Sequence, residues 1–263
     1  MGFIAREPLP GVCHIQDALG VCFTLIAGKE RALLIDAGYG LEDAAAFVGT
    51  LTDRPVTLWL THGHHDHALG AMWFAAPRLH PAERAVYEAY TGEARRRAVL
   101  DTARGKGIDP DEAGYLTATM PAQVVSEGET MDLGGLTAEI RPCPGHTPGS
   151  MVVFVPERKL LLTGDDWNPC TWLFFPEALP VGAYRERLRS LLALPFEWVL
   201  CPHRPELFPR QMFEAFAGGL TDEAIARARP VDTGARLGIR TAEAALPGGQ
   251  TLVFDADKAG LSF

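Results

Sequence analysis

The sequence has 263 residues, of which 47% are hydrophobic and 22% are charged, and its formal net charge at pH 7 is −9. This composition is typical of a globular protein with a large buried core, either one larger α/β domain or two small ones. The acidic balance argues against a protein that binds the phosphate backbone of nucleic acids, because such proteins normally present a basic face.

The N-terminal segment has no apolar run of signal-peptide length, and no stretch approaches the roughly 18 uninterrupted apolar residues of a membrane span. The 5 cysteines are scattered along the chain and form no CxxC pair. Such usage is typical of reduced cytosolic thiols rather than of a disulfide framework. We therefore expect a cytoplasmic protein with no membrane segment, and the sequence says nothing about its oligomeric state.

The first half of the chain predicts a hairpin followed by alternating helices and strands. Gly28 and Lys29 separate two apolar runs rich in β-forming residues, which indicates the hairpin. The predicted elements are, in chain order, strands at 21–26 and 32–35, a helix at 42–50, a strand at 56–60 and a helical stretch at 81–103.

A second β-rich half begins near Gln123 and is punctuated by Gly128 and by Gly134 with Gly135. Its predicted elements are strands at 124–125, 131–133 and 136–140, a hairpin of 151–155 with 159–162, a helix at 184–194, a strand at 198–200, a helix at 209–228, and late strands at 236–240 and 251–254. Because strands and helices follow each other in the same order in both halves, we expect two packed sheets with helices outside.

The stretch THGHHDH, directly after the strand predicted at 56–60, contains four of the 8 histidines of the chain. On a helix at about 100° per residue, its polar side chains would scatter around the axis, whereas a loop can turn them towards one point. Imidazole nitrogens and carboxylate oxygens are good ligands for zinc and similar divalent ions. The stretch therefore predicts a metal site, and we expect His65 to point away from it.

The pattern His62-x-His64-x-Asp66-His67 resembles the HxHxDH signature of metallo-β-lactamase-fold hydrolases. Further segments resemble the pattern of that family in the same order: DAG at 36–38, PCPGHTPGS at 142–150, LLTGD at 161–165 and VLCPH at 199–203. Proline stands before the last histidine where the family usually has glycine. The resemblance implies an α/β fold, a four-layer αβ/βα sandwich of two mixed sheets with outer helices, formed by a single domain over residues 1–263.

The resemblance also implies two metal sites, built from residues that lie far apart in the sequence. The first divalent ion would be held by His62, His64 and His146, the second by Asp66, His67 and His203, and Asp165 would bridge the two. Zinc is the expected metal, and iron or manganese would also suit this mixed set of ligands.

The implied activity is hydrolysis of a small ester, thioester or lactone by a metal-bridging hydroxide, with Asp66 and Asp165 as the catalytic residues. Two divalent ions outweigh two carboxylates and one hydroxide by about one charge, which favours an anionic small-molecule substrate. Glyoxalase II-like and lactonase-like enzymes share this ligand pattern. The alternatives are a mononuclear iron oxidoreductase of the persulfide dioxygenase type, a phosphodiesterase of the same fold, and a protein that binds metal without turnover.

Other residues are expected to border the site because they lie close to ligand positions in the sequence. Asp166 is a candidate proton donor or hydrogen-bond partner of a ligand histidine, with a solvated carboxylate as the alternative. The three cysteines Cys143, Cys170 and Cys201 are expected to pack in the core or beside the ligands.

Two segments are candidates for the walls of a substrate cleft. The aromatic residues of 167–175 follow the proposed bridging aspartate and would form one wall. A helical insertion at about 81–119 would lie over the cleft, with Tyr87, Tyr90 and Tyr115 as candidates for substrate contact.

Overall fold

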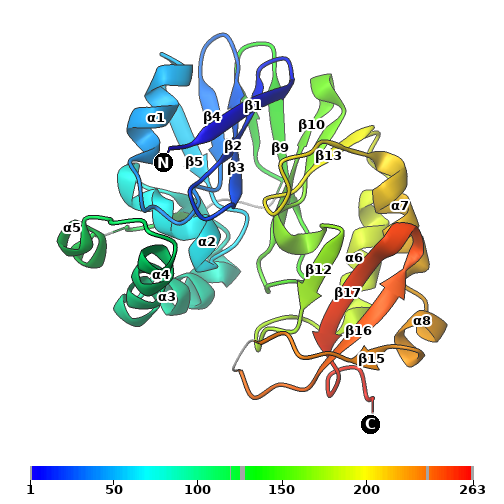
Figure 1. Ribbon diagram of the computed structural model, residues 1–263. Helices are drawn as coiled ribbons and strands as arrows, with labels where there is room; N and C mark the ends of the chain where they lie inside the picture. Colours follow the sequence, from blue (N-terminus) through cyan, green and yellow to red (C-terminus); the bar gives the residue numbers. More distant parts are fainter. Residues whose placement is uncertain (1, 119, 125–127, 235–236, 262–263) are drawn as a thin grey trace.

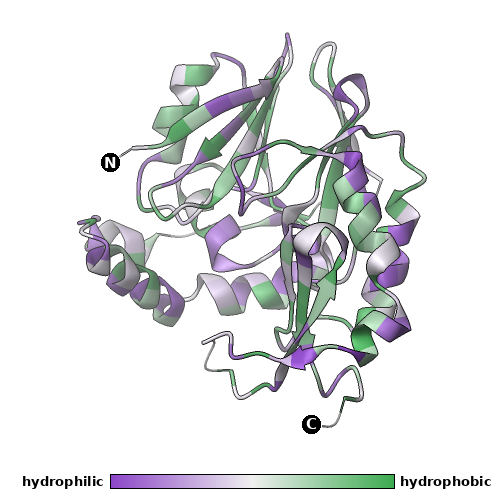
Figure 2. Ribbon diagram, turned by 45° about the vertical axis from the view of Figure 1, so that its right-hand side comes forward, coloured by the Kyte–Doolittle hydropathy of each residue, from purple (hydrophilic) through white to green (hydrophobic). Residues whose placement is uncertain are grey.

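Two β-sheets pack face to face in the centre of the protein, and helices cover their outer faces (Figure 1). The structure is a computed structural model and describes residues 2–118, 120–124, 128–234 and 237–261. Hydrophobic residues follow the central strands, and hydrophilic residues lie on the solvent-facing sides of the helices (Figure 2). The predicted α/β sandwich is confirmed.

The first sheet combines an antiparallel half with a parallel half, which join at β4. Its strands, in spatial order, are β1 (Ile4–Leu9), β2 (Val12–Gln16), β3 (Cys22–Ala27), β4 (Ala32–Ile35), β5 (Val56–Trp59), β6 (Arg78–Leu79) and β7 (Gln123–Val124). The predicted hairpin corresponds to β3 and β4. The second residue of the strand predicted at 124–125 lies outside the described residues.

The second sheet is also mixed, and a smaller third sheet continues beyond it. The second contains β14 (Phe208–Pro209), β13 (Trp198–Leu200), β11 (Leu160–Leu162), β10 (Met151–Val155), β9 (Thr137–Pro142) and β8 (Thr130–Asp132). The third contains β12 (Cys170–Leu173), β17 (Gln250–Asp255), β16 (Thr241–Leu246) and β15 (Arg229–Pro230). The sequence predicted two sheets, and among the described residues hydrogen bonding divides the strands into three.

All five residues of the strand β10 are apolar and buried, because other elements cover both of its faces. Met151, Val153 and Val155 face the first sheet, where they pack in one hydrophobic cluster with Ile26 and Leu33. Val152 and Phe154 belong to a different cluster, formed with the helices and the third sheet. Since successive side chains of a strand point to opposite faces, a strand covered on both faces has no polar position.

The helices flank the sheets and carry the connections between strands. They are α1 (Ala44–Leu51), α2 (His65–Ala68), α3 (Arg84–Thr91), α4 (Glu93–Gly105), α5 (Glu112–Thr117), α6 (Val181–Leu191), α7 (Arg210–Gly219) and α8 (Asp222–Ala226). Short 3₁₀ turns are η1 (Leu69–Trp73), η2 (Pro81–Glu83), η3 (Pro156–Arg158), η4 (Gly164–Asp166) and η5 (Pro247–Gly249). No helix of the described residues is long and apolar enough to cross a membrane, and the cytoplasmic location stays a prediction.

Several predicted boundaries are wrong for local reasons. The helix predicted at 81–103 is divided by Gly92, whose extended backbone begins α4. The helix predicted at 209–228 is interrupted before Thr221, whose hydroxyl accepts a hydrogen bond from Ala224 N and starts α8. The strand predicted at 236–240 does not form in its described part, 237–240, where Gly238 has a φ of 67°; its first residue lies outside the described range.

Candidate metal centre

Four segments carry the predicted ligands to one edge of the sheets. The strand β5 leads into the loop that holds His62 and His64, and the connection between β9 and β10 carries His146. Asp165 lies in η4 directly after β11, and His203 follows β13. Strands that end at the same edge place their following residues close together, although these residues are far apart in the sequence.

The histidine-rich stretch is not a loop throughout. His62 and His64 lie in an extended turn, but Asp66 and His67 belong to the one-turn helix α2, which begins at His65. Because the backbone changes from extended to helical after His64, the side chains before and after this residue belong to different groups of candidate ligands. The predicted loop is therefore correct for His62 and His64. Asp66 and His67 also turn towards the site, but they do so from a short helix and not from a loop.

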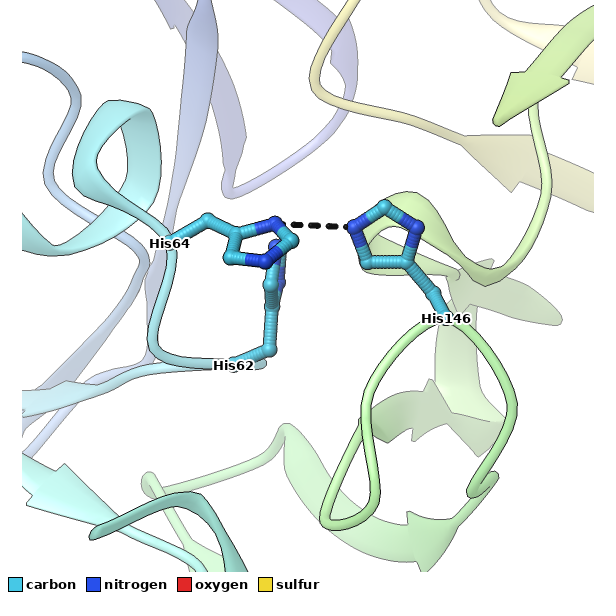
Figure 3. Close-up of side chains that lie close together, drawn as sticks. All are labelled: His62, His64 and His146. Atoms are coloured by element: carbon cyan, nitrogen blue, oxygen red, sulfur yellow. Dashed lines mark hydrogen bonds between the residues drawn. The ribbon is translucent and has the colours of Figure 1, made fainter. Parts of the chain in front are cut away.

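The first group consists of His62, His64 and His146, which are at most 3% exposed. Their ring nitrogens lie within 4.8 Å of one another. Figure 3 shows the rings of His64 and His146, carried by separate loops, pointing towards each other. His64 Nδ1 and His146 Nε2 are 3.0 Å apart.

The hydrogen bonds on the far sides of the His64 and His146 rings show which nitrogen of each ring carries the proton. His64 Nε2 is 2.6 Å from a carboxylate oxygen of Glu177, and His146 Nδ1 is 2.7 Å from the carbonyl oxygen of Trp172. Both partners only accept, so each of these ring nitrogens carries the proton and donates. The two nitrogens that face each other therefore both present lone pairs, an arrangement that a bound cation would satisfy.

The second group consists of Asp66, His67, Asp165 and His203, whose ligand atoms also lie within 4.8 Å of one another. His203 Nε2 is 3.0 Å from Asp165 Oδ1 and 3.1 Å from Oδ2. The other oxygen–nitrogen distances are 3.4 Å from His67 Nε2 to Asp165 Oδ1 and 3.7 Å from His203 Nε2 to Asp66 Oδ2. Asp165 Oδ2 also lies 3.6 Å from His146 Nε2, so this carboxylate is within reach of both groups.

Several ligand atoms of these groups are buried without a hydrogen-bond partner. Within the described chain these are His62 Nε2, His67 Nε2 and Asp165 Oδ1. Buried polar atoms are nearly always satisfied, so the two imidazole nitrogens, one in each group, call for a binding partner that the protein does not supply. Asp165 Oδ1 has the ion-pair contact with His203 described above. Imidazole nitrogens and a carboxylate oxygen together fit a zinc-like divalent ion.

Asp36, directly after β4, fixes the orientation of His67. One of its oxygens accepts from His67 Nδ1 at 2.9 Å and from the Thr61 hydroxyl at 2.8 Å, and the other accepts from Thr61 N at 2.7 Å. Asp36 holds a φ of 61°, a left-handed conformation that is unfavourable for residues other than glycine. Its hydrogen bonds leave His67 Nε2 as the ring nitrogen that faces the second group.

The ionisation of the two groups differs. Burial, helped by His67 and His64, holds the pKa of His62 well below its usual range, and burial lowers the pKa of His146 to about 4. These rings are neutral at pH 7 and have free lone pairs. Burial acts to raise the pKa of Asp165, but His203 and His67 outweigh it and hold that pKa well below its usual value. The carboxylate of Asp165 is therefore ionised.

Asp166 does not reach the cleft. It is 1% exposed, and its Oδ1 accepts from the backbone N of His146 at 3.2 Å. Burial raises its pKa well above the usual value, with Asp165 and Glu83 adding to the effect. Asp166 therefore supports the His146 loop through the backbone rather than through the imidazole ring, and it is neither a solvated carboxylate nor placed to give a proton to a substrate.

A cleft of about 560 Å³ opens over the two groups. It is lined by Tyr39, His64, His65, Asp66, Tyr90, Asp165, Asn168, Cys170, Trp172, Phe175, His203 and Arg204. His65 belongs to neither group of candidate ligands, but it does not point fully away from them, because its Nδ1 lies 3.7 Å from Asp66 Oδ1. Its ring lies between Tyr39 and Tyr90, with ring centroids 5.6 Å and 6.0 Å away. Tyr39, Glu177 and Arg204 were not predicted to line the cleft: Tyr39 and Arg204 directly follow the segments 36–38 and 199–203 but are not part of their patterns, and Glu177 lies in no ligand pattern.

The two predicted wall segments each contribute only some of their residues. Trp172 and Phe175 line the cleft, whereas Trp167 and Phe174 are buried in the core. From the insertion, of which residue 119 lies outside the described range, only Tyr90 reaches the cleft. Its ring lies 4.3 Å from that of His64.

The other two tyrosines of the insertion anchor it. The Tyr87 hydroxyl donates to the carbonyl of Met120 at 2.7 Å, and the Tyr115 hydroxyl donates to the carbonyl of Tyr39 at 2.7 Å. Both side chains are buried. They therefore hold the insertion against the protein instead of contacting a substrate.

The three cysteines expected near the ligands differ in their exposure. Cys143 and Cys201 are buried, as predicted, and burial raises the pKa of both thiols. Cys170 is exposed and lines the cleft, where the prediction of a packed residue is wrong. It begins the edge strand β12, so one side of its backbone is not covered by another strand.

Comparisons with known proteins agree on one family. The family model described as "Metallo-beta-lactamase superfamily" matches residues 18–203, a range that contains both groups of ligands. An acyl-coenzyme A thioesterase, MBLAC2 of Gallus gallus, is 28% identical over 220 residues, 72% of this chain and 76% of that protein. A hydroxyacylglutathione hydrolase of Erythrobacter litoralis (strain HTCC2594) is 27% identical over 166 residues, 62% of this chain and 53% of that protein.

Among solved structures, TTHA1623 in a di-iron-bound form is 27% identical to this chain. The similarity covers 74% of this chain and 93% of that chain, with a TM-score of 0.55. A protein of the same fold with a related sequence therefore holds two metal ions.

Proposed function

The chain belongs to the metallo-β-lactamase superfamily, and on this basis we propose that it is a metal-dependent hydrolase that cleaves a thioester of a small acyl group. The observation that carries the proposal is the convergence of two groups of ligand side chains at the floor of one cleft. The two similar proteins named as thioester hydrolases support the choice of thioesters over other esters and lactones.

We propose that all seven predicted ligands have the roles assigned above. His62, His64 and His146 hold the first ion, Asp66, His67 and His203 hold the second, and Asp165 reaches both. Two divalent ions at such a site lower the pKa of a water molecule towards neutrality and polarise a substrate carbonyl. Zinc is the proposed metal, and iron or manganese fits the same ligands.

The residues of this chain would orient the thioester so that water adds to its carbonyl carbon and the carbon–sulfur bond breaks, releasing an acid and a thiol. His64 of the first group lines the cleft beside Tyr90 and Phe175, whose rings lie 4.3 Å and 4.8 Å from its own. These apolar rings exclude water beside the reacting carbonyl. Arg204, exposed at the other side of the cleft next to His203, provides a positive charge for an anionic part of the substrate.

A substrate panel with the metal-loaded protein tests the reaction class. We expect hydrolysis of an acyl-coenzyme A and of a hydroxyacylglutathione, with kcat/KM at least about tenfold above that for a lactone or a phosphodiester, a difference of about 1.4 kcal/mol in transition-state binding. Metal analysis of the same sample should give two ions per chain. One iron per chain together with oxidation of a persulfide would instead establish the dioxygenase alternative, and phosphodiester cleavage alone would establish a phosphodiesterase.

The Trp172 side chain offers a test of the cleft as the acyl-binding surface. It is 41% exposed beside the first group, so its removal leaves the core intact. We expect Trp172→Ala to raise KM for a long-chain acyl thioester by about tenfold, because about 50 Å² of lost apolar contact at 25 cal/mol per Å² corresponds to about 1.3 kcal/mol. KM for an acetyl thioester should change much less.

A matched control for this variant is Trp198→Ala. Trp198 is 36% exposed and lies on β13 outside the cleft, so its replacement should leave both KM values unchanged. Equal effects of Trp172→Ala on long and short acyl chains would show that the acyl group binds elsewhere.

A further inference from the structure

A buried carboxylate outside the ligand set connects the loops of the first group. Glu83, the last residue of η2, is 0% exposed. The described chain provides no ion pair for it. Its Oε2 accepts from Gly63 N at 2.8 Å, and its Oε1 accepts from Gly149 N at 2.6 Å. Burying a carboxylate is costly unless it is hydrogen-bonded, so these two bonds account for its position.

The two bonded glycines belong to different ligand loops. Gly63 lies between His62 and His64, and Gly149 is three residues after His146. Each oxygen of Glu83 therefore holds one of the loops that contribute to the first group. One further backbone bond, from Met151 N to the carbonyl of Thr61 at 3.0 Å, ties the same loops together.

Both loops also pack closely against residues near Glu83. A Cβ atom at Gly63 would lie 2.5 Å from Tyr87 N, and a Cβ atom at Gly149 would lie 2.7 Å from His80 Nδ1 and 3.0 Å from Glu83 N. At Gly63 the atom in the way belongs to the backbone of Tyr87, so the chain would have to move, whereas at Gly149 the nearest atom belongs to the His80 side chain. The start of the helical insertion is thus in direct contact with both ligand loops, and the backbone contact at Gly63 leaves no room for a side chain there.

We propose that Glu83 is a positioning residue that fixes the distance between the loop of His62 and His64 and the loop of His146. The inference rests on the proposed metal-binding role of these histidines. The separation of His64 Nδ1 and His146 Nε2, 3.0 Å, depends on how the two loops lie relative to each other. Because ligand distances in a metal site must be correct to about 0.2 Å, a small shift of one loop weakens binding. Among the described residues, the hydrogen bonds of Glu83 go to Gly63 and Gly149 and not to the second group, so we expect the second group to bind its ion without Glu83.

The variant Glu83→Gln tests this role with little change in shape. The amide keeps one accepting oxygen, but its NH₂ group faces the second backbone N–H and cannot accept from it. One loop therefore loses its partner. The control is Glu88→Gln, the same substitution at an exposed position of α3 five residues further along.

The measurement is the affinity for Zn²⁺, determined by competition with a chromophoric chelator in two backgrounds. His203→Ala impairs the second group and leaves the first to bind Zn²⁺, and His146→Ala does the reverse. We expect Glu83→Gln to weaken Zn²⁺ binding by about 10–100-fold in the His203→Ala background, the usual effect of losing a supporting partner of a ligand. In the His146→Ala background the affinity should not change, and Glu88→Gln should have no effect in either.

Each other outcome has a defined meaning. Unchanged affinity in both backgrounds, or an equal loss in both, overturns the role of Glu83. If His146→Ala and His203→Ala bind Zn²⁺ as tightly as the parent protein, the assignment of the ligands fails instead. If Glu83→Gln does not fold, Glu83→Asp is used, because its shorter side chain keeps the charge but cannot reach both loops. Failure of both variants to fold would limit Glu83 to a role in the fold and overturn the proposal.

Discussion

Replacement of Asp165 with asparagine is expected to lower kcat/KM for a thioester by at least about 10³-fold. The carboxylate lies 3.0 Å from His203 Nε2 and 3.6 Å from His146 Nε2, so it is the residue that reaches both groups. Asparagine removes its negative charge and replaces one acceptor oxygen with an NH₂ group that repels a cation. A loss of about 4 kcal/mol of transition-state stabilisation, at 1.36 kcal/mol per factor of ten, gives the stated effect.

Metal content and a surface control make this result specific. We expect Asp165→Asn to retain less than the full set of ions, because the ligand within reach of both groups has lost its charge. Asp101→Asn, at a position whose side chain is 79% exposed on α4, should keep full activity and metal content. An Asp165→Asn variant that binds two ions and keeps more than about a tenth of the activity would contradict the assignment of Asp165, since a tenfold change corresponds to only about 1.4 kcal/mol.

Removal of the metal ions with a chelator is expected to abolish thioester hydrolysis and to lower the unfolding temperature. A ligand present at about 1,000 times its Kd stabilises the folded state by about 4 kcal/mol. For a protein of this size each kcal/mol corresponds to about 2–4 °C, so the unfolding temperature should fall by about 8–16 °C. The physical cause is the loss of the partner of buried ligand atoms such as His62 Nε2 and His67 Nε2.

Adding back single metals identifies the active ion. Zinc is expected to restore both activity and the unfolding temperature, and parallel samples with iron and manganese show whether either ion does so equally well. His203→Ala, which impairs one group only, should show a smaller temperature shift on chelation than the parent protein. Full activity and an unchanged unfolding temperature after chelation would contradict a metal-dependent hydrolase.

Hydrogen-bond acceptors from distant parts of the chain orient three of the candidate ligand histidines. Asp36 orients His67, Glu177 orients His64, and the carbonyl of Trp172 orients His146. Each of these acceptors fixes which ring nitrogen carries the proton and which one faces the other candidate ligands. The Glu177 carboxylate also bonds to Tyr90, whose pKa is raised by burial and by this neighbour. The insertion is thereby tied to the floor of the cleft.

The residues of the candidate metal centre can be predicted from the sequence, because they lie in short local patterns. Four ligand residues lie in one stretch of six positions, and the strand–turn segments around His146, Asp165 and His203 resemble a family pattern in the same order. The hairpin predicted at 151–155 with 159–162 forms as β10 and β11, and the structure shows that the residues of both strands are all buried. Their apolar sequences fit this position, since a strand covered on both faces has no polar position.

The residues that hydrogen-bond to the candidate ligands and line the cleft cannot be predicted from the sequence, because they depend on the tertiary structure. Glu177 is 113 positions from the histidine that it contacts, and no local pattern predicts a contact over such a separation. Tyr87 and Tyr90 both lie on α3, yet one is buried and the other lines the cleft. A residue on a helix faces the core or the cleft according to how the whole helix packs, and its neighbours in sequence do not contain that information. Local patterns predicted the residues of the two candidate metal-binding groups, whereas the packing of helices and loops determined the walls of the cleft and the distances within these groups.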